Sequence, residues 1–367
     1  MVEIQRLEPK PIYVTRPCLP SLSEFTTGLK KIWDTRILTN MGPYHQELEQ
    51  QLKEYLNVPY ISLFSSGTTA LYTALKVLNL EKCDIITTPF SFPATSHVIK
   101  LVDSNPMFVD IDPKNCCMDI NDLDNAINIY TSAIMPVHVY GNSCDIEAIS
   151  WLSKKHNLKV IYDAAHCFAP DNDILKAGDL SILSFHATKI FNTLEGGAII
   201  SHDLEMKERI DSFSSFGISK HDIMPEIGFN AKMNEIQSLI GVLNLKDIPK
   251  VIESRKRLTN NYNYYFINNS KIKIIPSSNY SYYPILVNNR DKLYNRLRDN
   301  NIYARRYFYP LISNLKPYKD IVTAKEYNLP IANEIANKIL CLPLYPDLTK
   351  DEQKRIVDMV LEEPLEL

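Results

Sequence analysis

Between residues 60 and 202 the sequence alternates strand-length apolar runs with stretches whose apolar residues recur at helical spacing. Repeated strand and helix patterns predict βαβ units, because parallel neighbouring strands need a long crossover connection and a helix is the usual one. Helices then cover both faces of the sheet, which explains why the runs are almost wholly apolar. The expected strands lie at 60–64, 84–89, 106–112, 132–140, 159–165, 179–186 and 197–202. The sequence therefore predicts an α/β protein with a mostly parallel sheet.

The pattern changes near residue 234. Residues 234–268 read as one or two long helices, and a smaller α+β region follows, with an apolar run at 282–287 and a last helix from Thr349. We therefore divide the chain into an N-terminal arm and large domain, residues 1–245, and a small C-terminal α+β domain, residues 246–367. Within the large domain, Asp119 is expected to cap a helix.

Composition excludes several classes of protein. The formal net charge of −3 does not indicate binding to nucleic acid or to an anionic membrane. The first ten residues lack the apolar core of a signal peptide, and "SSGTT" interrupts the uncharged stretch 55–75, so we expect no membrane span. Seven cysteines without a secretory signal favour a reduced, cytoplasmic protein.

Motifs for metal or nucleotide hydrolysis are missing. No G-x-G-x-x-G or Walker A sequence occurs. The histidines and cysteines that fall near strand ends do not follow a zinc-binding spacing, so no metal site is expected. These residues are His138, Cys144, His166, Cys167 and His186.

Polar groups follow three of the expected strands. "SSGTT" leaves one strand and opens a helix, Asp163 ends the apolar run "KVIYD", and Lys189 lies in "SFHATKIFNTLEGG" behind another strand. Each has an ordinary alternative: a simple N-cap, a structural carboxylate and a surface lysine. Because ligands bind beyond the carboxyl ends of the strands of an open α/β sheet, the three groups are expected to lie close together.

Together the three groups match the needs of pyridoxal 5'-phosphate (PLP). Its phosphate needs a helix N-terminus, its pyridine nitrogen needs a carboxylate, and its aldehyde needs an amine. Glycine is scarce in this chain, at ten of 367 residues, so the glycines that remain, most of them after expected strands or beside polar turns, are expected to hold backbone positions closed to other residues. Gly67, Gly196 and Gly197 are among them.

The sequence resembles the DegT/DnrJ/EryC1/StrS sugar-nucleotide aminotransferases from about Tyr13 to the C-terminus. The resemblance is carried by "SSGTTAL", "PFSFPAT", "VHVYGNSCD", "VIYDAAHCFA", "LSFHATKIFNTLEGGAI" and "GFNAKMNEIQ". It implies the PLP-dependent transferase fold of aspartate-aminotransferase type (fold type I). Many members read T-G-E-G-G where this chain has Thr193-Leu194-Glu195-Gly196-Gly197, so Leu194 departs from the pattern.

The resemblance implies roles for individual residues. Lys189 would form the Schiff base with PLP, Asp163 would pair with the pyridine nitrogen, and His166 would lie near the ring hydroxyl. The remaining cofactor contacts would be made by Gly67, Thr68, Ser184, Phe92 and Asn230. Asn230 would reach the phosphate from the neighbouring subunit, from the start of the helix carrying "AKMNEIQSLIGVL", which implies a homodimer with shared sites.

The reaction implied by the resemblance is transfer of the amino group of L-glutamate to a nucleotide-linked keto-deoxysugar. The preferred substrate is dTDP-4-keto-6-deoxy-D-glucose, giving a 4-amino-4,6-dideoxy sugar for surface polysaccharide such as O-antigen. A dTDP-3-keto sugar, GDP-4-keto-6-deoxymannose, a PLP sugar dehydratase and a non-catalytic PLP-binding regulator are the alternatives. The predicted substrate contacts are Thr39, Asn40, Arg305, Arg306 and Tyr307.

Overall fold

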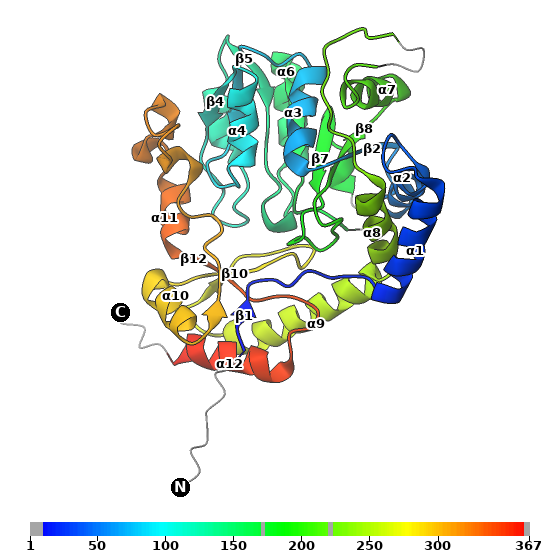
Figure 1. Ribbon diagram of the computed structural model, residues 1–367. Coiled ribbons are helices and arrows are strands. Elements are labelled where there is room, and N and C mark those ends of the chain that lie inside the picture. Colours follow the sequence, from blue (N-terminus) through cyan, green and yellow to red (C-terminus); the bar gives the residue numbers. More distant parts are fainter. Residues whose placement is uncertain (1–9, 170–172, 219–222, 363–367) are drawn as a thin grey trace.

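The computed structural model describes residues 10–169, 173–218 and 223–362. In this part of the chain the main element is a seven-stranded sheet in the order β2-β8-β7-β6-β5-β3-β4 (Figure 1). Strand β8 runs against both of its neighbours, and the other neighbouring pairs are parallel. The strands are β2 (Tyr60–Phe64), β3 (Asp84–Thr87), β4 (Asn105–Phe108), β5 (Thr131–Ile134), β6 (Lys159–Asp163), β7 (Leu180–Ser184) and β8 (Gly197–Ser201). The predicted α/β class with a mostly parallel sheet is confirmed.

Two hydrophobic cores explain why the strands are apolar on both faces. Successive side chains of a strand point to opposite faces of its sheet. In β6, Ile161 packs into the core on one face, whereas Val160 and Tyr162 pack into the core on the other. Ile85 and Ile86 of β3 divide in the same way. Both faces of the sheet are therefore buried, and helices must cover both of them to keep water away.

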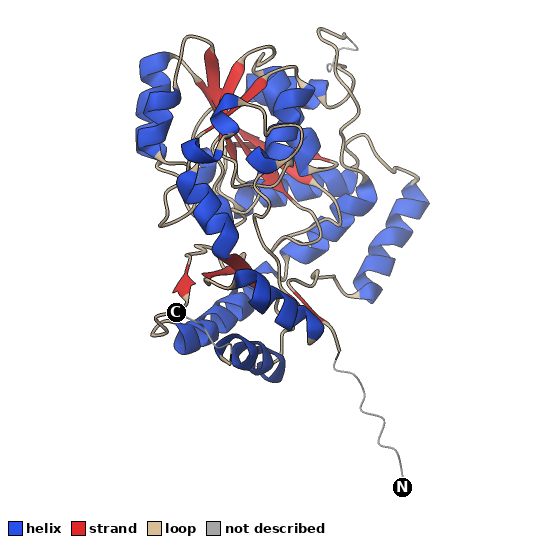
Figure 2. Cartoon of the chain, turned by 90° about the vertical axis from the view of Figure 1, so that its left-hand side faces the viewer, coloured by secondary structure: helices blue, strands red, loops and turns tan. Residues whose placement is uncertain are grey.

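Helices cover the two faces of the sheet, as the side view shows (Figure 2). Residues of α3, α4 and α7 pack on one face, and residues of α2, α6 and α8 pack on the other. The bounds are α1 (Leu22–Thr35), α2 (Pro43–Tyr55), α3 (Gly67–Val77), α4 (Ala94–Leu101), α5 (Ile120–Ala126), α6 (Ile146–His156), α7 (Leu204–Phe213) and α8 (Glu235–Leu245). Asp119 accepts hydrogen bonds from the N–H groups of Asn121 and Asp122, so the predicted cap of α5 is confirmed.

The C-terminal elements have a core of their own beneath the large sheet (Figure 1). Strands β9 (Lys273–Ile274), β10 (Tyr283–Leu286) and β12 (Ile339–Leu342) pair antiparallel. Strand β1 (Ile12–Tyr13) pairs in parallel with β11 (Ile302–Tyr303), so the N-terminal arm packs against C-terminal elements. The helices beyond residue 245 are α9 (Ile248–Phe266), α10 (Arg290–Asp299), α11 (Pro330–Lys338) and α12 (Lys350–Leu361), of which α11 packs into a core of the large sheet instead. Thr349, from which the last helix was expected, is the N-cap of α12. The domain division near residue 245 stays a prediction.

Some strands are shorter than expected, since β4 ends at Phe108 rather than at residue 112 and β6 ends at Asp163 rather than at residue 165. Two larger differences need correction. The strand expected at 132–140 ends at Ile134, because Pro136 has no N–H group for the ladder and Tyr140 has a left-handed φ of 55°. The helix expected to begin near Asn230 begins at Glu235, with Asn234 as its N-cap. Asn230 instead lies in an extended segment that bridges Ser215. Residues 234–268 form two helices, α8 and α9.

Candidate active site

A cavity of about 240 Å³ lies at the carboxyl ends of the strands of the large sheet. Its walls come from segments that follow β2, β3, β6 and β7, which meet at this edge because those strands are parallel. The structure brings eight of the predicted site residues into this cavity. They are Gly67, Thr68, Phe92, Asp163, His166, Ser184, Lys189 and Tyr307.

The other predicted site residues do not line this cavity. Asn230 is exposed outside it, as are Thr39 and Asn40. Arg305 and Arg306 line a neighbouring groove instead. Asn230 therefore does not line the cavity of its own chain, and its expected role in a neighbouring subunit stays a prediction.

The first turn of α3 presents free backbone donors to the cavity. Ser66 Oγ accepts the N–H of Thr69, and Thr69 Oγ1 accepts the N–H of Ser66, each at 3.2 Å. No described residue accepts a hydrogen bond from the N–H groups of Gly67 or Thr68. Gly67 also approaches Ser184 closely, since a Cβ on Gly67 would lie 3.0 Å from Ser184 Cβ. Two N–H groups, the helix dipole and a hydroxyl thus form an anion site.

Asp163 ends β6 with its carboxylate buried at the cavity wall, 4% exposed. Thr95 Oγ1 donates to Asp163 Oδ2 at 2.8 Å, and the N–H of Ala165 donates to Oδ1 at 3.2 Å. Burial raises the pKa of the Asp163 carboxyl, against these hydrogen bonds and the charge of Lys189. Among the described residues no cation lies within ion-pair distance of this carboxylate. A cationic ligand atom would supply the missing partner.

Lys189 follows β7 and brings an amine into the same cavity. The loss of hydration lowers the pKa of Lys189 to about 8, although the charge of Asp163 opposes this shift. A lysine in this state holds a useful fraction of neutral, nucleophilic amine at neutral pH. Lys189 is therefore not the exposed surface lysine of the alternative interpretation.

His166 is held as a neutral donor. Its Nδ1 accepts the N–H of Tyr140 at 3.2 Å, which leaves the proton on Nε2. Burial, together with the charge of Lys189, lowers the pKa of His166 well below its usual value. The ring is parallel to that of Phe308, with centroids 6.0 Å apart, and lies edge-on to Tyr282. His166 is therefore oriented by aromatic packing rather than by a charged partner.

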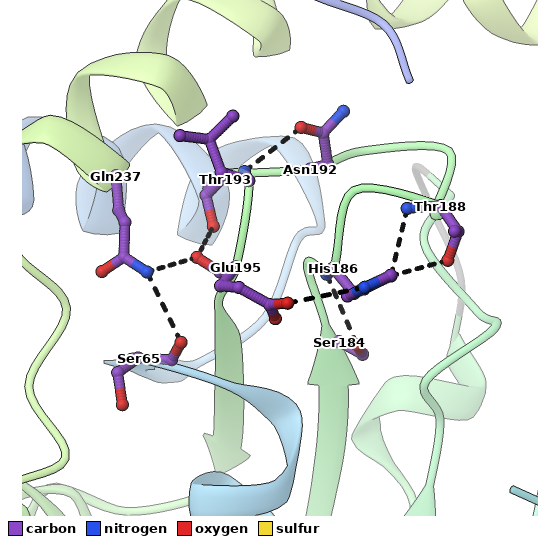
Figure 3. Close-up of polar contacts among 9 residues, drawn as sticks. Ser65, Ser184, His186, Thr188, Asn192, Thr193, Glu195 and Gln237 are labelled. Atoms are coloured by element: carbon purple, nitrogen blue, oxygen red, sulfur yellow. Dashed lines mark hydrogen bonds and ion pairs between the residues drawn. The ribbon is translucent and has the colours of Figure 1, made fainter. Parts of the chain in front are cut away.

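The loop from Ser184 to Gly197 is anchored at both ends (Figure 3). Gln237 of α8 donates to the carbonyl of Glu195 at 2.6 Å and to that of Ser65 at 3.5 Å, which ties the loop to the end of β2. Thr193 Oγ1 also donates to the Glu195 carbonyl, at 2.8 Å. The His186 ring joins Thr188 and the carboxylate of Glu195. The loop that carries Lys189 is thus held by backbone and side-chain contacts.

Leu194 stands where the family pattern has glycine, and its backbone adopts a conformation that favours glycine. Its φ is 68°, in the left-handed region that favours glycine. Its N–H donates to Asn192 Oδ1 at 3.2 Å, and its side chain is 41% exposed. The backbone conformation suited to glycine is therefore kept here by a leucine.

Sequence reasoning did not identify several residues that complete the cavity. Thr95 lies in the quoted motif "PFSFPAT", and its position at the start of a helix after a strand could have suggested a role. Tyr282 and Phe308 reach the cavity from beyond residue 245, and no local pattern indicated them. Glu195 is part of a quoted motif only, and His186 is considered otherwise only as one of the residues that do not follow a zinc-binding spacing.

None of the helices described is long and apolar enough to cross a membrane. No group of three or more His, Cys, Asp or Glu side chains is arranged to hold a metal ion in residues 10–169, 173–218 and 223–362.

Curated relatives match almost the whole chain. The dTDP-4-amino-4,6-dideoxy-D-glucose transaminase of Shigella dysenteriae is 46% identical over 366 residues, which cover 96% of this chain and 99% of that protein. The Escherichia coli protein of the same name is 43% identical over 370 residues, covering 96% and 98%. The GDP-perosamine synthase of Escherichia coli O157:H7 is 29% identical over 366 residues, covering 94% and 98%.

Solved structures confirm the predicted fold. DesI, crystallised in the presence of its TDP-sugar product, superposes with a TM-score of 0.89 and is 26% identical, covering 96% of this chain and 92% of its own. NtdA from Bacillus subtilis with bound cofactor PMP superposes with a TM-score of 0.85 at 28% identity, covering 93% and 81%. A family model matches residues 22–361. The chain belongs to the DegT/DnrJ/EryC1/StrS aminotransferase family.

Proposed function

We propose that this protein transfers the amino group of L-glutamate to dTDP-4-keto-6-deoxy-D-glucose, giving dTDP-4-amino-4,6-dideoxy-D-glucose. The observation that carries the proposal is the convergence of a reactive lysine, a buried carboxylate and a helix N-terminus in one cavity. The choice of substrate is supported by the names of two relatives that are 46% and 43% identical over nearly the whole chain.

The residues of the cavity fit PLP. The free N–H groups of Gly67 and Thr68, with the Ser184 hydroxyl, would hold the phosphate. Asp163 has no cationic partner in the described part of the chain and would hold a protonated pyridine nitrogen. Bound in this way, PLP supplies an electron sink for the carbon that gains or loses the amino group. Lys189 would carry the cofactor covalently, His166 would donate to its ring hydroxyl, and Phe92 would cover one face.

Lys189 is also suited to move a proton. Its pKa of about 8 lets Nζ accept a proton from the donor's Cα and release it at neutral pH. The lysine is largely removed from water, beside cavity walls that include Tyr282 and Phe308, which limits competition from bulk water for that proton. We assign Lys189 as the acid–base group of both half-reactions.

We further propose a homodimer in which Asn230 serves the active site of the partner. Asn230 is exposed and lies outside the cavity of its own chain. Apolar side chains gather near it without cover, which supports an interface there because isolated subunits rarely leave such patches exposed. These side chains are Phe216, Ile218, Ile223, Met224 and Ile227, exposed by 52%, 41%, 60%, 67% and 92%.

The proposed setting is the cytoplasm, with the amino sugar used for surface polysaccharide such as O-antigen. No disulfide joins the seven cysteines, which is usual for proteins of reducing compartments.

GDP-4-keto-6-deoxymannose remains the second candidate substrate, supported by the 29% identity to a GDP-perosamine synthase. A sugar dehydratase is disfavoured, because its relatives replace the lysine found here at position 189.

A panel of substrates tests the proposal. Purified protein should be yellow when loaded with PLP, and its absorbance should shift on adding L-glutamate. With glutamate, dTDP-4-keto-6-deoxy-D-glucose should be aminated faster than dTDP-3-keto or GDP-4-keto sugars, as measured by mass spectrometry of the products. Preference for the GDP sugar would contradict the assigned substrate, and Lys189→Ala serves as the inactive control.

A further inference from the structure

Two neighbouring arginines beside the active site have different surroundings. Arg305 and Arg306 are adjacent in the sequence and both line a groove of about 250 Å³ next to the cavity. The groove and the cavity share four wall residues, so they form two parts of one longer cleft. The shared residues are Ser91, Phe92, Tyr307 and Phe308.

Arg306 is already engaged by its own chain. Its guanidinium donates to Asp291 Oδ1 at 2.9 Å. The same group lies over the rings of Tyr294 and Tyr309, 4.5 Å and 4.9 Å from their centroids. An arginine held by a carboxylate and two aromatic rings has little capacity left for an anionic ligand.

Arg305 is exposed and its charge is not neutralised. No carboxylate of the described residues lies within ion-pair distance of its guanidinium. Its backbone is fixed by two hydrogen bonds to Cys341 of β12, of 3.1 Å and 2.7 Å. Burial raises the pKa of Tyr307, and the positive charge of Arg305 opposes this rise, so the charge acts on a residue shared by groove and cavity.

We propose that Arg305 binds the diphosphate of the nucleotide-sugar substrate in this groove, and that Arg306 is a positioning residue that holds Tyr294 and Tyr309. This inference rests on the proposed function. The sugar carbon that reacts must lie in the cavity with Lys189, and its diphosphate must then extend into an adjoining space. An unpaired guanidinium on a fixed backbone suits a diphosphate, because its fork can make two parallel hydrogen bonds to phosphate oxygens.

The amino donor is the other anion that Arg305 could bind. Glutamate is short, and it must place its Cα beside Lys189, whereas Arg305 lines the groove and not the cavity. We therefore expect Arg305 to contribute to binding of the nucleotide sugar and not to reaction with glutamate.

Titration calorimetry with dTDP tests the inference on the PLP-loaded, full-length protein, in which the phosphate site of the cofactor is filled. Arg305→Ala should weaken dTDP binding by about 10- to 100-fold, the usual effect of losing a charge-assisted hydrogen-bonded pair. Arg305→Lys should give an intermediate loss, because the charge remains but the fork does not. The matched control is Arg298→Ala, which removes an exposed charge from α10 and should leave the dTDP affinity unchanged.

A second measurement separates the two anions. The rate at which L-glutamate shifts the cofactor absorbance should be the same in Arg305→Ala and in the wild type. Equal dTDP affinity in the two proteins, no measurable dTDP binding by the wild type, or a slower reaction with glutamate alone would each overturn the inference. Binding that depends on Arg305 in a protein that fails to aminate any dTDP sugar would uphold it and reject the proposed substrate.

Discussion

A Cβ atom placed on Gly197 would lie 2.6 Å from the backbone nitrogen of Gly67, so the first residue of β8 touches the first turn of α3. Real Cβ atoms do not approach backbone so closely, and the backbone of Gly67 cannot turn away as a side chain can. The second glycine of "EGG" is thus required by the position of the proposed phosphate site.

Gly197→Ala should therefore displace the start of α3. We expect a loss of about 1–3 kcal/mol in the free energy of unfolding, as for other overpacked sites, together with weaker PLP binding. Chemical denaturation and PLP titration by absorbance measure the two effects. The control is Gly28→Ala in α1, whose Cβ would press on the side chain of Leu239 in α8, a residue that does not line the cavity. It should lose stability and keep its PLP affinity; equal PLP affinity in both variants would contradict the account.

Part of the site could be predicted from the sequence because strand ends share an edge. Gly67, Asp163 and Lys189 each follow an apolar run, so their meeting needed only the parallel sheet. Tyr282 and Phe308 could not be predicted, because periodicity does not say how elements beyond residue 245 pack on the sheet edge.

Environment also separates residues that look alike in the sequence. Arg305 and Arg306 are neighbours, yet one is exposed and the other is paired with Asp291, and this depends on where α10 packs. A motif also does not fix the residue at every position, because Leu194 adopts a φ of 68°, which favours glycine, without being glycine. The motif predicts a helix from about Asn230, whereas α8 begins at Glu235, because its N-cap, Asn234, lies inside the motif.

Covalent capture of PLP by the cofactor-free protein should depend on pH through Lys189. Only the neutral amine reacts, so the capture rate should rise about tenfold per pH unit below the pKa of about 8 and level off above it. If Lys189 were fully hydrated, the capture rate would instead keep rising with pH up to the ordinary lysine pKa of 10.5. Stopped-flow absorbance against pH gives the midpoint.

Removing the charge of Asp163 tests whether that midpoint reports the pKa of Lys189. Asp163 raises the pKa of Lys189 against the effect of burial, so Asp163→Asn should move the midpoint to lower pH. Asp110→Asn, a buried aspartate remote from Lys189, should not move it. A midpoint near 10.5 in the wild type would show that Lys189 is an ordinary solvated lysine.

Asp163→Asn should also lower kcat by about 100-fold or more while PLP remains bound, because an amide does not stabilise a protonated ring nitrogen. Steady-state kinetics and PLP titration measure the two quantities. Asp110→Asn is again the control. Asp110 accepts the N–H groups of Ile331 and Ala332 at 2.7 Å each and caps α11, so its loss should cost about 1–3 kcal/mol of stability without lowering kcat. Unchanged kcat in Asp163→Asn would make Asp163 a structural residue only.

Mixed dimers test the shared site. Lys189→Ala should be inactive, and Asn230→Asp should be impaired because a carboxylate would repel the phosphate. When the two variants are co-expressed and the heterodimer is purified with two different tags, both defects fall on one active site if Asn230 serves the partner. The other site is then intact, and up to half of the wild-type activity should return. No recovery, or a fully active monomer at any dilution, would refute the shared site.

Transfer of labelled nitrogen is the most direct measurement. Wild-type protein with PLP, L-glutamate labelled with ¹⁵N and dTDP-4-keto-6-deoxy-D-glucose should yield a dTDP-amino sugar that carries the label, with release of 2-oxoglutarate. Nitrogen NMR should place the label on C4 of the sugar, and Lys189→Ala should give none. An unlabelled sugar, or a product that has lost water and gained no nitrogen, would contradict the assignment of this chain as an aminotransferase acting on that substrate.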